Sequence, residues 1–385
     1  MKSSRRNFLA AGIALPAVTT FANVSGTARM EPPAPAAGAM PLRKLGKTGL
    51  SVTPVAFGCM ITSDASVIEK AADLGINYFD TARGYQSGNN ERMVGAALKS
   101  KRKQLVISTK SHAGTKEAAL ADLDTSLKEI GTDYVDIWYL HAKTKAEQIT
   151  DELMEAQRIA KQQGKIRFAG VSTHGGFDSV FPAAIGKKHF DVILTSYNFA
   201  IADQVEKHIA AAKAAGIGVV AMKVMAGGFR TNREGSPVRE KLNREGAFLA
   251  ALKWCLRSGS QVDTTIPSMT DMDQLDENLK AMTVPFSDAD TSVLAAQLRG
   301  ITPMYCRACG GCEGQCPKGL PVPELVRFAM YSDGYGQFAL GRENFLALPQ
   351  EVRAVRCSDC SECAVQCRNG VHVAARLTRA QELYA

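Results

Sequence analysis

The sequence lacks several features that would assign it to common classes of protein. It has no apolar run of the roughly 20 residues that a spanning helix needs, so no integral membrane segment is predicted. It has no dense run of Lys and Arg with interleaved aromatic residues, so nothing supports a nucleic-acid partner. No G-x-G-x-x-G follows an early strand, which counts against a Rossmann domain. The sequence also contains no H-x-x-x-H, so it does not predict a mononuclear metal site.

Cysteine is abundant instead, and eight of the ten cysteines repeat one pattern, C-x2-C-x2-C-x3-C. The first copy is Cys306, Cys309, Cys312 and Cys316, and the second is Cys357, Cys360, Cys363 and Cys367. Three thiolates at this spacing can reach three iron corners of a [4Fe-4S] cube, and a fourth thiolate must come from elsewhere. Zinc usually shows two well-separated C-x2-C pairs, and disulfides need geometry that such short loops rarely supply. The pattern therefore predicts two [4Fe-4S] clusters.

The two copies also suggest how the clusters are held. In two-cluster ferredoxins the fourth Cys of each run binds the cluster of the other run. The corresponding hypothesis gives Cys367 to the cluster of the first run and Cys316 to the cluster of the second run.

The N-terminus predicts export. Residues 4–9 read S-R-R-N-F-L, a modestly apolar stretch follows at 9–18, and no acidic residue occurs before Glu31. This pattern is typical of a twin-arginine signal, although a basic disordered tail would have similar composition. That route carries folded proteins with their cofactors, which suits a protein with clusters, and it predicts a periplasmic location. Half of the net charge of +8 lies in the first 30 residues. The charge of the remaining residues is therefore only weak evidence for an acidic partner.

Strand-like and helix-like runs alternate between the N-terminus and the cysteines. We expect strands at residues 54–58, 77–81, 105–109, 134–141, 167–172, 191–196, 218–223 and 264–267. Most of the segments between them read as helices, for example 117–130, 151–163, 204–215 and 247–257. Eight such units predict an α/β fold with a closed (β/α)8 TIM barrel, and a doubly wound open sheet is the alternative. Chemistry would then lie at the carboxyl ends of the strands.

Four polar residues stand at such ends. Asp80 and Tyr85 belong to F-D-T-A-R-G-Y, Lys110 ends I-S-T-K, and His141 ends W-Y-L-H. With these motifs the chain resembles the aldo-keto reductase family over residues 42–282, in a branch that carries a C-terminal two-cluster domain. The resemblance implies that Tyr85 is a general acid toward a carbonyl, that Lys110 lowers its pKa, that Asp80 holds Lys110, and that His141 orients the carbonyl oxygen.

The same resemblance assigns a nicotinamide nucleotide site, and here the sequence departs from the family. Ser172 is kept, but Thr173 replaces an Asn and Leu194 replaces a Gln that would grip the carboxamide. Tyr197 is the expected platform for the nicotinamide ring. The remaining residues implied to contact the nucleotide are Ala226, Gly227, Gly228, Ser268, Gln274 and Asn278. Ser268 and Gln274 stand where many members carry Lys and Arg for a 2′-phosphate, so we expect weak NADPH preference at best.

We therefore expect three parts: a signal peptide and linker at 1–40, a reductase-like barrel at 41–300, and an α-helical ferredoxin-like domain at 301–385. The preferred function is oxidation or reduction of a small carbonyl or alcohol, with electrons exchanged through the clusters and a redox protein partner. The alternatives are an ordinary NAD(P)H-dependent reductase with auxiliary clusters and an electron-transfer protein whose barrel is only a docking scaffold. The sequence does not indicate an oligomeric state.

Overall fold

The computed structural model describes residues 40–228 and 246–385. The segment predicted to be a twin-arginine signal lies outside the described residues. The described part forms one compact unit.

A parallel sheet of eight strands is the centre of this unit, in the order β10-β9-β8-β7-β6-β5-β4-β3. The strands are β3 (Phe57–Gly58), β4 (Tyr78–Asp80), β5 (Val106–Ser111), β6 (Val135–Leu140), β7 (Ile166–Thr173), β8 (Val192–Ser196), β9 (Gly218–Met222) and β10 (Thr264–Thr265). A parallel bridge between Val55 and Thr265 joins the two ends, so the sheet is a nearly closed barrel. This confirms the predicted (β/α)8 fold over the open-sheet alternative.

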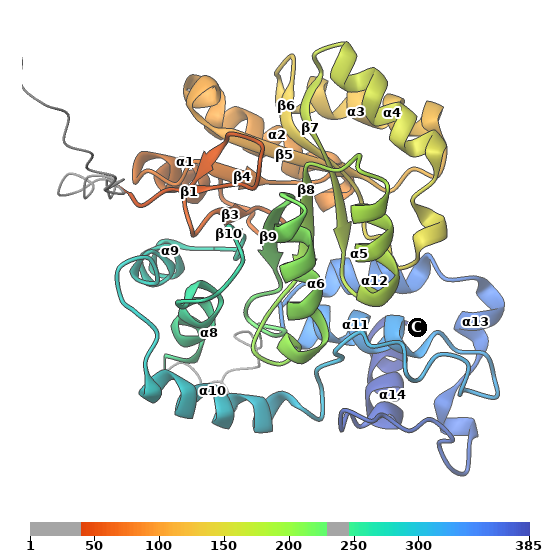
Figure 1. The fold of residues 1–385 in the computed structure, drawn as a ribbon. Helices are drawn as coiled ribbons and strands as arrows, with labels where there is room; N and C mark the ends of the chain where they lie inside the picture. The colour runs from red at the N-terminus through yellow and green to blue at the C-terminus, as the bar shows by residue number, and fades with distance from the viewer. Residues whose placement is uncertain (1–39, 229–245) are drawn as a thin grey trace, which may run out of the picture. The chain divides into compact units, whose positions relative to one another are not determined.

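Helices follow the strands and cover the outside of the barrel (Figure 1). They are α1 (Ala65–Asp73), α2 (Asn89–Leu98), α3 (Lys116–Ile130), α4 (Asp151–Gln162), α5 (Phe177–Gly186), α6 (Ala202–Ala214), α8 (Ala247–Leu256) and α9 (Met272–Lys280). A further helix, α10 (Asp288–Ile301), follows α9 and packs on α8. Local signals set their ends. The Thr115 side chain accepts a hydrogen bond from the Ala118 N–H at the start of α3, and Gly131 ends that helix in the left-handed region at φ 72°.

A hairpin of β1 (Arg43–Lys44) and β2 (Ser51–Val52) closes one end of the barrel. Its side chains Leu45, Leu50 and Val52 pack into the apolar core inside the barrel, against residues such as Tyr78 and Val220. Asp80 ends β4 at the opposite end of the barrel, where the strands finish. The end of the barrel that the hairpin closes is therefore structural. The opposite end, where the strands finish, is open to a functional site.

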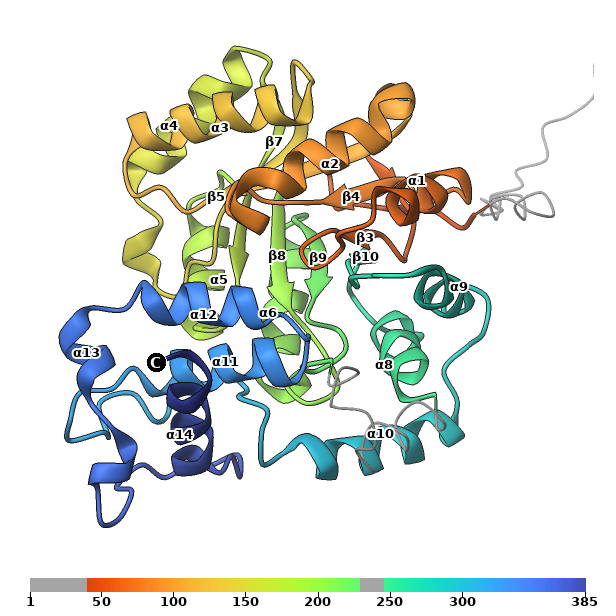
Figure 2. The ribbon, with the colours of Figure 1, turned by 180° about the vertical axis from the view of Figure 1, so that it is seen from behind.

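The C-terminal region is helical, as expected for the cysteine-bearing domain. It contains α11 (Val322–Asp333), α12 (Phe338–Leu346), α13 (Gln350–Ala354) and α14 (Val373–Tyr384), and the cysteines lie in the loops between them. α11 packs against both α12 and α14 around a core of its own, and most of the cysteines lie partly buried against that core. Both ribbon views place α11 beside the ends of β8 and β9 (Figures 1 and 2). The Lys223 ammonium, just after β9, lies 5.8 Å from the Tyr331 ring of α11.

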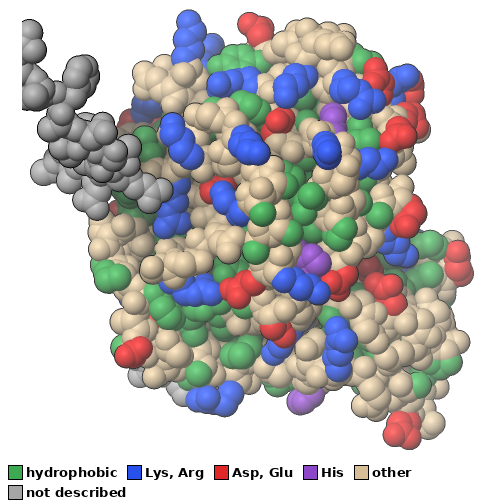
Figure 3. All heavy atoms as spheres, in the orientation of Figure 1, with side chains coloured by type: hydrophobic (Ala, Val, Ile, Leu, Met, Phe, Trp, Pro, Cys, Tyr) green, Lys and Arg blue, Asp and Glu red, His purple; other side chains and the backbone are tan. Residues whose placement is uncertain are grey.

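The surface carries charges of both signs. Lys and Arg side chains are interspersed with Asp and Glu on the face shown in Figure 3. Among the described residues, no helix combines the length and apolar character needed to cross a bilayer.

Candidate functional site

Three neighbouring strands bring the four predicted catalytic residues together. Asp80 ends β4, Lys110 lies in β5, and His141 follows β6, while Tyr85 begins the short 3-10 helix after β4. The Lys110 ammonium donates to Asp80 Oδ2 at 2.6 Å and lies 3.3 Å from the Tyr85 hydroxyl. It also donates to the Thr81 carbonyl at 2.6 Å, which completes its three hydrogen bonds.

The environment fixes the charge of this lysine. Burial lowers the pKa of Lys110, but the Asp80 carboxylate and Tyr85 outweigh it, so that pKa is raised. Lys110 is therefore an ammonium at neutral pH. Burial raises the pKa of Tyr85 and Lys110 opposes that effect, so the phenol is protonated at neutral pH and can donate its proton.

His141 is buried and neutral. Desolvation lowers its pKa well below the ordinary value, and His112, Lys110 and His174 lower it further. Its ring stacks on His112 with centroids 3.8 Å apart and meets Tyr85 edge-on at 6.0 Å. Its Nδ1 has no hydrogen-bond partner among the described residues. A neutral imidazole with a free nitrogen beside a phenol can hydrogen-bond a carbonyl oxygen of a bound substrate.

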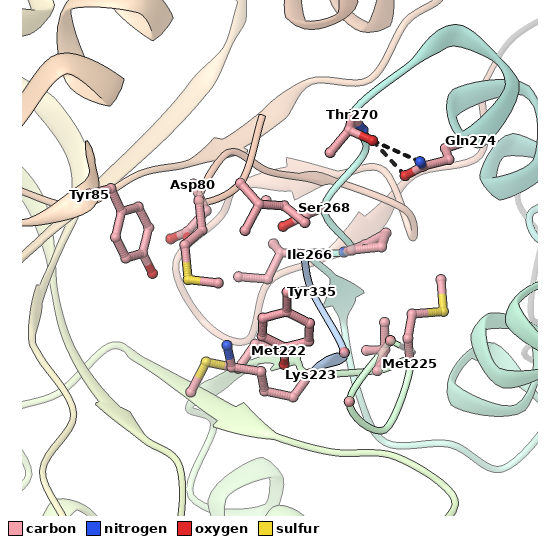
Figure 4. A pocket seen from close by; sticks show the side chains of 18 residues that line it. Asp80, Tyr85, Met222, Lys223, Met225, Ile266, Ser268, Thr270, Gln274 and Tyr335 are labelled. Atoms are coloured by element: carbon pink, nitrogen blue, oxygen red, sulfur yellow. Dashed lines mark hydrogen bonds between the residues drawn. The ribbon is translucent and has the colours of Figure 1, made fainter. Parts of the chain in front are cut away.

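A cavity of ≈ 130 Å³ opens beside Tyr85 and Asp80 (Figure 4). Four residues predicted to contact a nucleotide line it: Gly227, Gly228, Ser268 and Gln274. The Gln274 amide nitrogen is engaged by its own loop, because it donates to Thr270 Oγ1 at 2.7 Å and Asp271 Oδ2 at 2.6 Å.

The other residues assigned to the nucleotide do not line this cavity. Ser172 Oγ accepts from the Ala142 N–H at 2.8 Å, and Thr173 Oγ1 bonds to the backbone of Gly175. The remaining members of this group, Tyr197, Ala226 and Asn278, are all buried.

Tyr197 turns away from the cavity. Its hydroxyl donates to Glu206 of α6 at 2.7 Å, and its ring packs on Trp254 of α8 with centroids 4.9 Å apart. Leu194 lies in the apolar core inside the barrel. The structure therefore provides room beside Tyr85, but the groups expected to hold a nicotinamide ring and its amide do not face that room.

Among the residues that line the cavity but that sequence reasoning missed are Met222, Lys223 and Tyr335. Lys223 could have been found from the sequence, because it lies at the end of the predicted strand 218–223. Lys110 has the corresponding position at the end of the I-S-T-K motif. No local signal identified Tyr335, since it follows α11 in the C-terminal region and reaches the barrel only through the fold.

The cysteines form two neighbouring sets. Burial raises the pKa of Cys306 to about 11, and the thiols that add to this effect are Cys312, Cys309 and Cys367. Burial raises the pKa of Cys357 to about 11, and its contributing thiols are Cys316, Cys363 and Cys360. These are the two sets of the crossed arrangement.

The sets fit four-iron clusters by their chemistry. Each offers four thiols, and Cys309 Sγ also accepts a hydrogen bond from the Asn369 amide at 3.3 Å, as cluster sulfurs commonly do. Within residues 40–228 and 246–385, no three His, Cys, Asp or Glu side chains converge closely enough to hold a single metal ion.

Comparison with known proteins agrees with both halves of this description. Residues 62–298 match the model of the aldo/keto reductase family, and residues 305–372 match the model of the 4Fe-4S dicluster domain.

Similar full-length proteins are known from bacteria and plants. The uncharacterised oxidoreductase YqkF of Bacillus subtilis is 31% identical over 252 residues, which cover 59% of this chain and 79% of that protein. L-galactose dehydrogenase of Arabidopsis thaliana is 28% identical over 288 residues, covering 63% and 88%. The holo form of an aldo-keto reductase from Bacillus halodurans superposes with a TM-score of 0.57 at 26% identity, covering 67% of this chain and 96% of that one.

Proposed function

Because this chain belongs to the aldo/keto reductase family, we propose that it interconverts a small carbonyl compound and its alcohol at Tyr85, Lys110, Asp80 and His141. Electrons are exchanged through clusters held by the C-terminal cysteines. The observation that carries the proposal is the buried Lys110 ammonium between Asp80 and the Tyr85 hydroxyl, at the edge of an open cavity.

Reduction of the carbonyl to an alcohol adds two electrons and two protons. The Tyr85 hydroxyl gives one proton to the oxygen. The carbon would gain its hydrogen either as a hydride from a bound nicotinamide nucleotide or as two electrons passed singly from the clusters together with a proton from solvent. Lys110 stabilises the phenolate that remains, and Asp80 holds Lys110 in place. His141 donates a hydrogen bond to the same oxygen without adding a charge. In the oxidative direction the Tyr85 phenolate takes the proton back from the alcohol.

The cysteine sets supply the redox side of the proposal. Clusters bound there would accept or deliver electrons one at a time. The first set lies next to the barrel mouth, because Cys306 lines a small cavity together with His174 and Lys223. Lys223 also lines the cavity of Tyr85, so the first cluster and the proposed catalytic residues share a neighbour.

The second candidate is an ordinary NAD(P)H-dependent reductase with auxiliary clusters. It is favoured by the cavity itself, which Gly227, Gly228 and Ser268 line as the family resemblance implies. It is disfavoured by Ser172, Thr173 and Tyr197, whose polar groups bond elsewhere in the protein.

Anaerobic titration of cluster-loaded protein with NADPH and then NADH separates the two candidates. Nucleotide binding with bleaching of the cluster absorbance would show that the barrel feeds the clusters. Binding without bleaching would favour auxiliary clusters, and no binding at millimolar nucleotide would direct the search to a redox protein partner.

The variant Tyr85→Phe tests the chemistry. Loss of a positioned general acid is expected to reduce carbonyl turnover by about 10²–10⁴-fold, measured as kcat with the clusters intact. Tyr134→Phe is the matched control, because Tyr134 lies before β6 at the far end of the barrel and should leave turnover unchanged. Full activity in Tyr85→Phe would contradict the assignment.

We also propose that the protein is exported to the periplasm through the twin-arginine route. The support is the S-R-R-N-F-L sequence at residues 4–9 and the acid-free segment around it. Replacing both Arg5 and Arg6 by Lys should shift the protein to the cytoplasmic fraction, whereas Arg29→Lys should not. An unchanged distribution in the double variant would contradict export by this route.

A further inference from the structure

A second cavity lies between the barrel mouth and the first cysteine run. Its volume is ≈ 50 Å³, and it shares Lys223 and Tyr335 with the cavity beside Tyr85. The strand ends contribute His174, Ser196 and Lys223, and the C-terminal region contributes Tyr305, Cys306 and Arg327, among others. A space of this size holds a group of a few heavy atoms rather than a whole substrate.

The lining of this second cavity is cationic. It includes Lys223, Arg307 and Arg327, and no Asp or Glu belongs to it. Burial, Arg327 and Lys110 together lower the pKa of Lys223 to about 7, although Asp80 opposes them. Asp80 is itself engaged by Lys110 at 2.6 Å. The lining thus groups basic side chains with no carboxylate among them, and Arg327 disfavours the charged form of Lys223.

Arg327 has an unused donor. Its Nε is buried and has no hydrogen-bond partner in the described part of the chain. A buried guanidinium N–H without an acceptor is costly, so an acceptor such as water, an ion or a ligand is expected beside it.

Lys223 has an unfavourable backbone conformation, because its φ of 58° lies in the left-handed region. The Asn198 amide donates to the Lys223 carbonyl at 2.9 Å and to the Tyr305 hydroxyl at 3.0 Å. The amine stays beside the Tyr335 ring at 4.9 Å, and Figure 4 shows both side chains in the cavity that Tyr85 and Asp80 line.

We propose that Lys223 and Arg327 bind the anionic group of the substrate, so that the protein acts on a carbonyl or alcohol compound that carries a carboxylate or a phosphate. The proposal rests on the proposed function, because it places the anion next to the carbonyl that Tyr85 protonates. The shared residues Lys223 and Tyr335 connect the two cavities, so one small molecule can reach both.

A competing role for these cations is to balance the negative charge of a cluster at Cys306. Arg307 adjoins Cys306 and suits that role. Cluster charge alone does not account for Lys223, which also lines the cavity of Tyr85. The two roles predict different outcomes in one experiment.

The test is calorimetric binding to cluster-loaded protein of two matched pairs of probes: pyruvate against pyruvamide, and glyceraldehyde 3-phosphate against glyceraldehyde. We expect the anion of at least one pair to bind about tenfold or more tightly than its neutral partner, as charge-assisted hydrogen bonds do. A preference for pyruvate indicates a carboxylate substrate, and a preference for the phosphate indicates a phosphorylated one.

Arg327→Gln should remove most of this preference, because it should weaken binding of the anionic probe far more than binding of the neutral one. Lys223→Met should do the same, which keeps the test valid if one variant fails to fold. Arg342→Gln, an exposed position on α12, is the matched control and should retain the preference.

Equal affinity within both pairs, or no binding of any probe at millimolar concentration, would overturn the proposal. It would also be overturned if Arg327→Gln lowered the midpoint potential of a cluster without changing anion affinity, because the cations would then serve the cluster. Charge-selective binding without carbonyl turnover would instead support the anion site while refuting the proposed reaction. Turnover of neutral aldehydes with no preference for anionic compounds would support the proposed reaction and refute the anion site.

Discussion

At the scale of single residues, three histidines lie close together at the barrel mouth. His112 stacks on His141, and His174 lies close enough to lower the pKa of His141. Burial lowers the pKa of all three histidines, and the nearby cations Lys110, Lys143, Lys223 and Arg327 add to the effect at one or more of them. These imidazoles are therefore neutral where an unfolded chain would begin to protonate them.

This arrangement predicts that stability falls in mild acid. Because the folded pKa values lie below the unfolded value of about 6.5, the unfolded state binds more protons as the pH falls below that value. We expect the free energy of unfolding to fall between pH 7.5 and 5.5, with a slope approaching about 1.4 kcal/mol per pH unit for each histidine at the acid end.

Anaerobic urea unfolding followed by tryptophan fluorescence measures this slope. His174→Gln should make the slope smaller, whereas His372→Gln, outside this group, should leave it unchanged. A slope that is the same in His174→Gln and in the parent protein would show that His174 is not the cause.

At the scale of secondary structure elements, the helix that follows Tyr85 is positioned by close packing against its neighbour. α2 follows Tyr85 and packs on α3, and the buried Gly95 of α2 lies directly against the end of α3. A Cβ atom at this position would overlap the Ile130 carbonyl, which belongs to the backbone and cannot rotate away. The glycine is therefore required by packing rather than by its own backbone conformation.

Gly95→Ala is expected to destabilise the protein by about 1–3 kcal/mol, the usual cost of overpacking. Gly186→Ala is a matched control, because Gly186 is an exposed helical glycine of α5 with no atom within 4 Å of its would-be Cβ. That variant should be neutral or stabilising by up to about 1 kcal/mol, since Ala favours helix more than Gly does. Equal urea midpoints for the two variants would contradict this account.

At the scale of the whole molecule, two cysteine runs far apart in sequence become interleaved. Cys367 lies among the thiols of the first run, and Cys316 lies among those of the second. The cysteine region also touches the barrel, because a Cβ at Gly175 would come within 2.6 Å of the Ala308 carbonyl. Cluster assembly and docking of the C-terminal region on the barrel are therefore expected to depend on one another.

The crossed arrangement is tested in a protein that keeps only one cluster. Cys306→Ser should remove the cluster of the first run and halve the iron content, because a four-iron cube needs all four thiolates. Adding Cys316→Ser should then remove the remaining cluster, whereas adding Cys367→Ser should leave it, as followed by iron content and the electron paramagnetic resonance of the reduced protein. The opposite result for the two additions would show that each run binds its own cluster.

The sequence by itself determined the features whose physical cause is local. Three of the four ligands of each cluster follow one another at short intervals, so the C-x2-C-x2-C-x3-C runs were visible without a fold. Alternating strands and helices predicted the barrel, and the ends of its parallel strands brought Asp80, Lys110 and His141 to one edge. The twin-arginine signal and the limits of the domains stay predictions.

Only the tertiary structure decided where side chains point and which distant segments meet. Tyr197 follows a strand as expected, yet its ring turns outward because Trp254 and Glu206 offer it packing and a hydrogen bond. Lys223 and Arg327 line one cavity because α11 docks beside the end of β9. Such contacts arise from packing between elements far apart in the chain, which no local pattern of residues encodes.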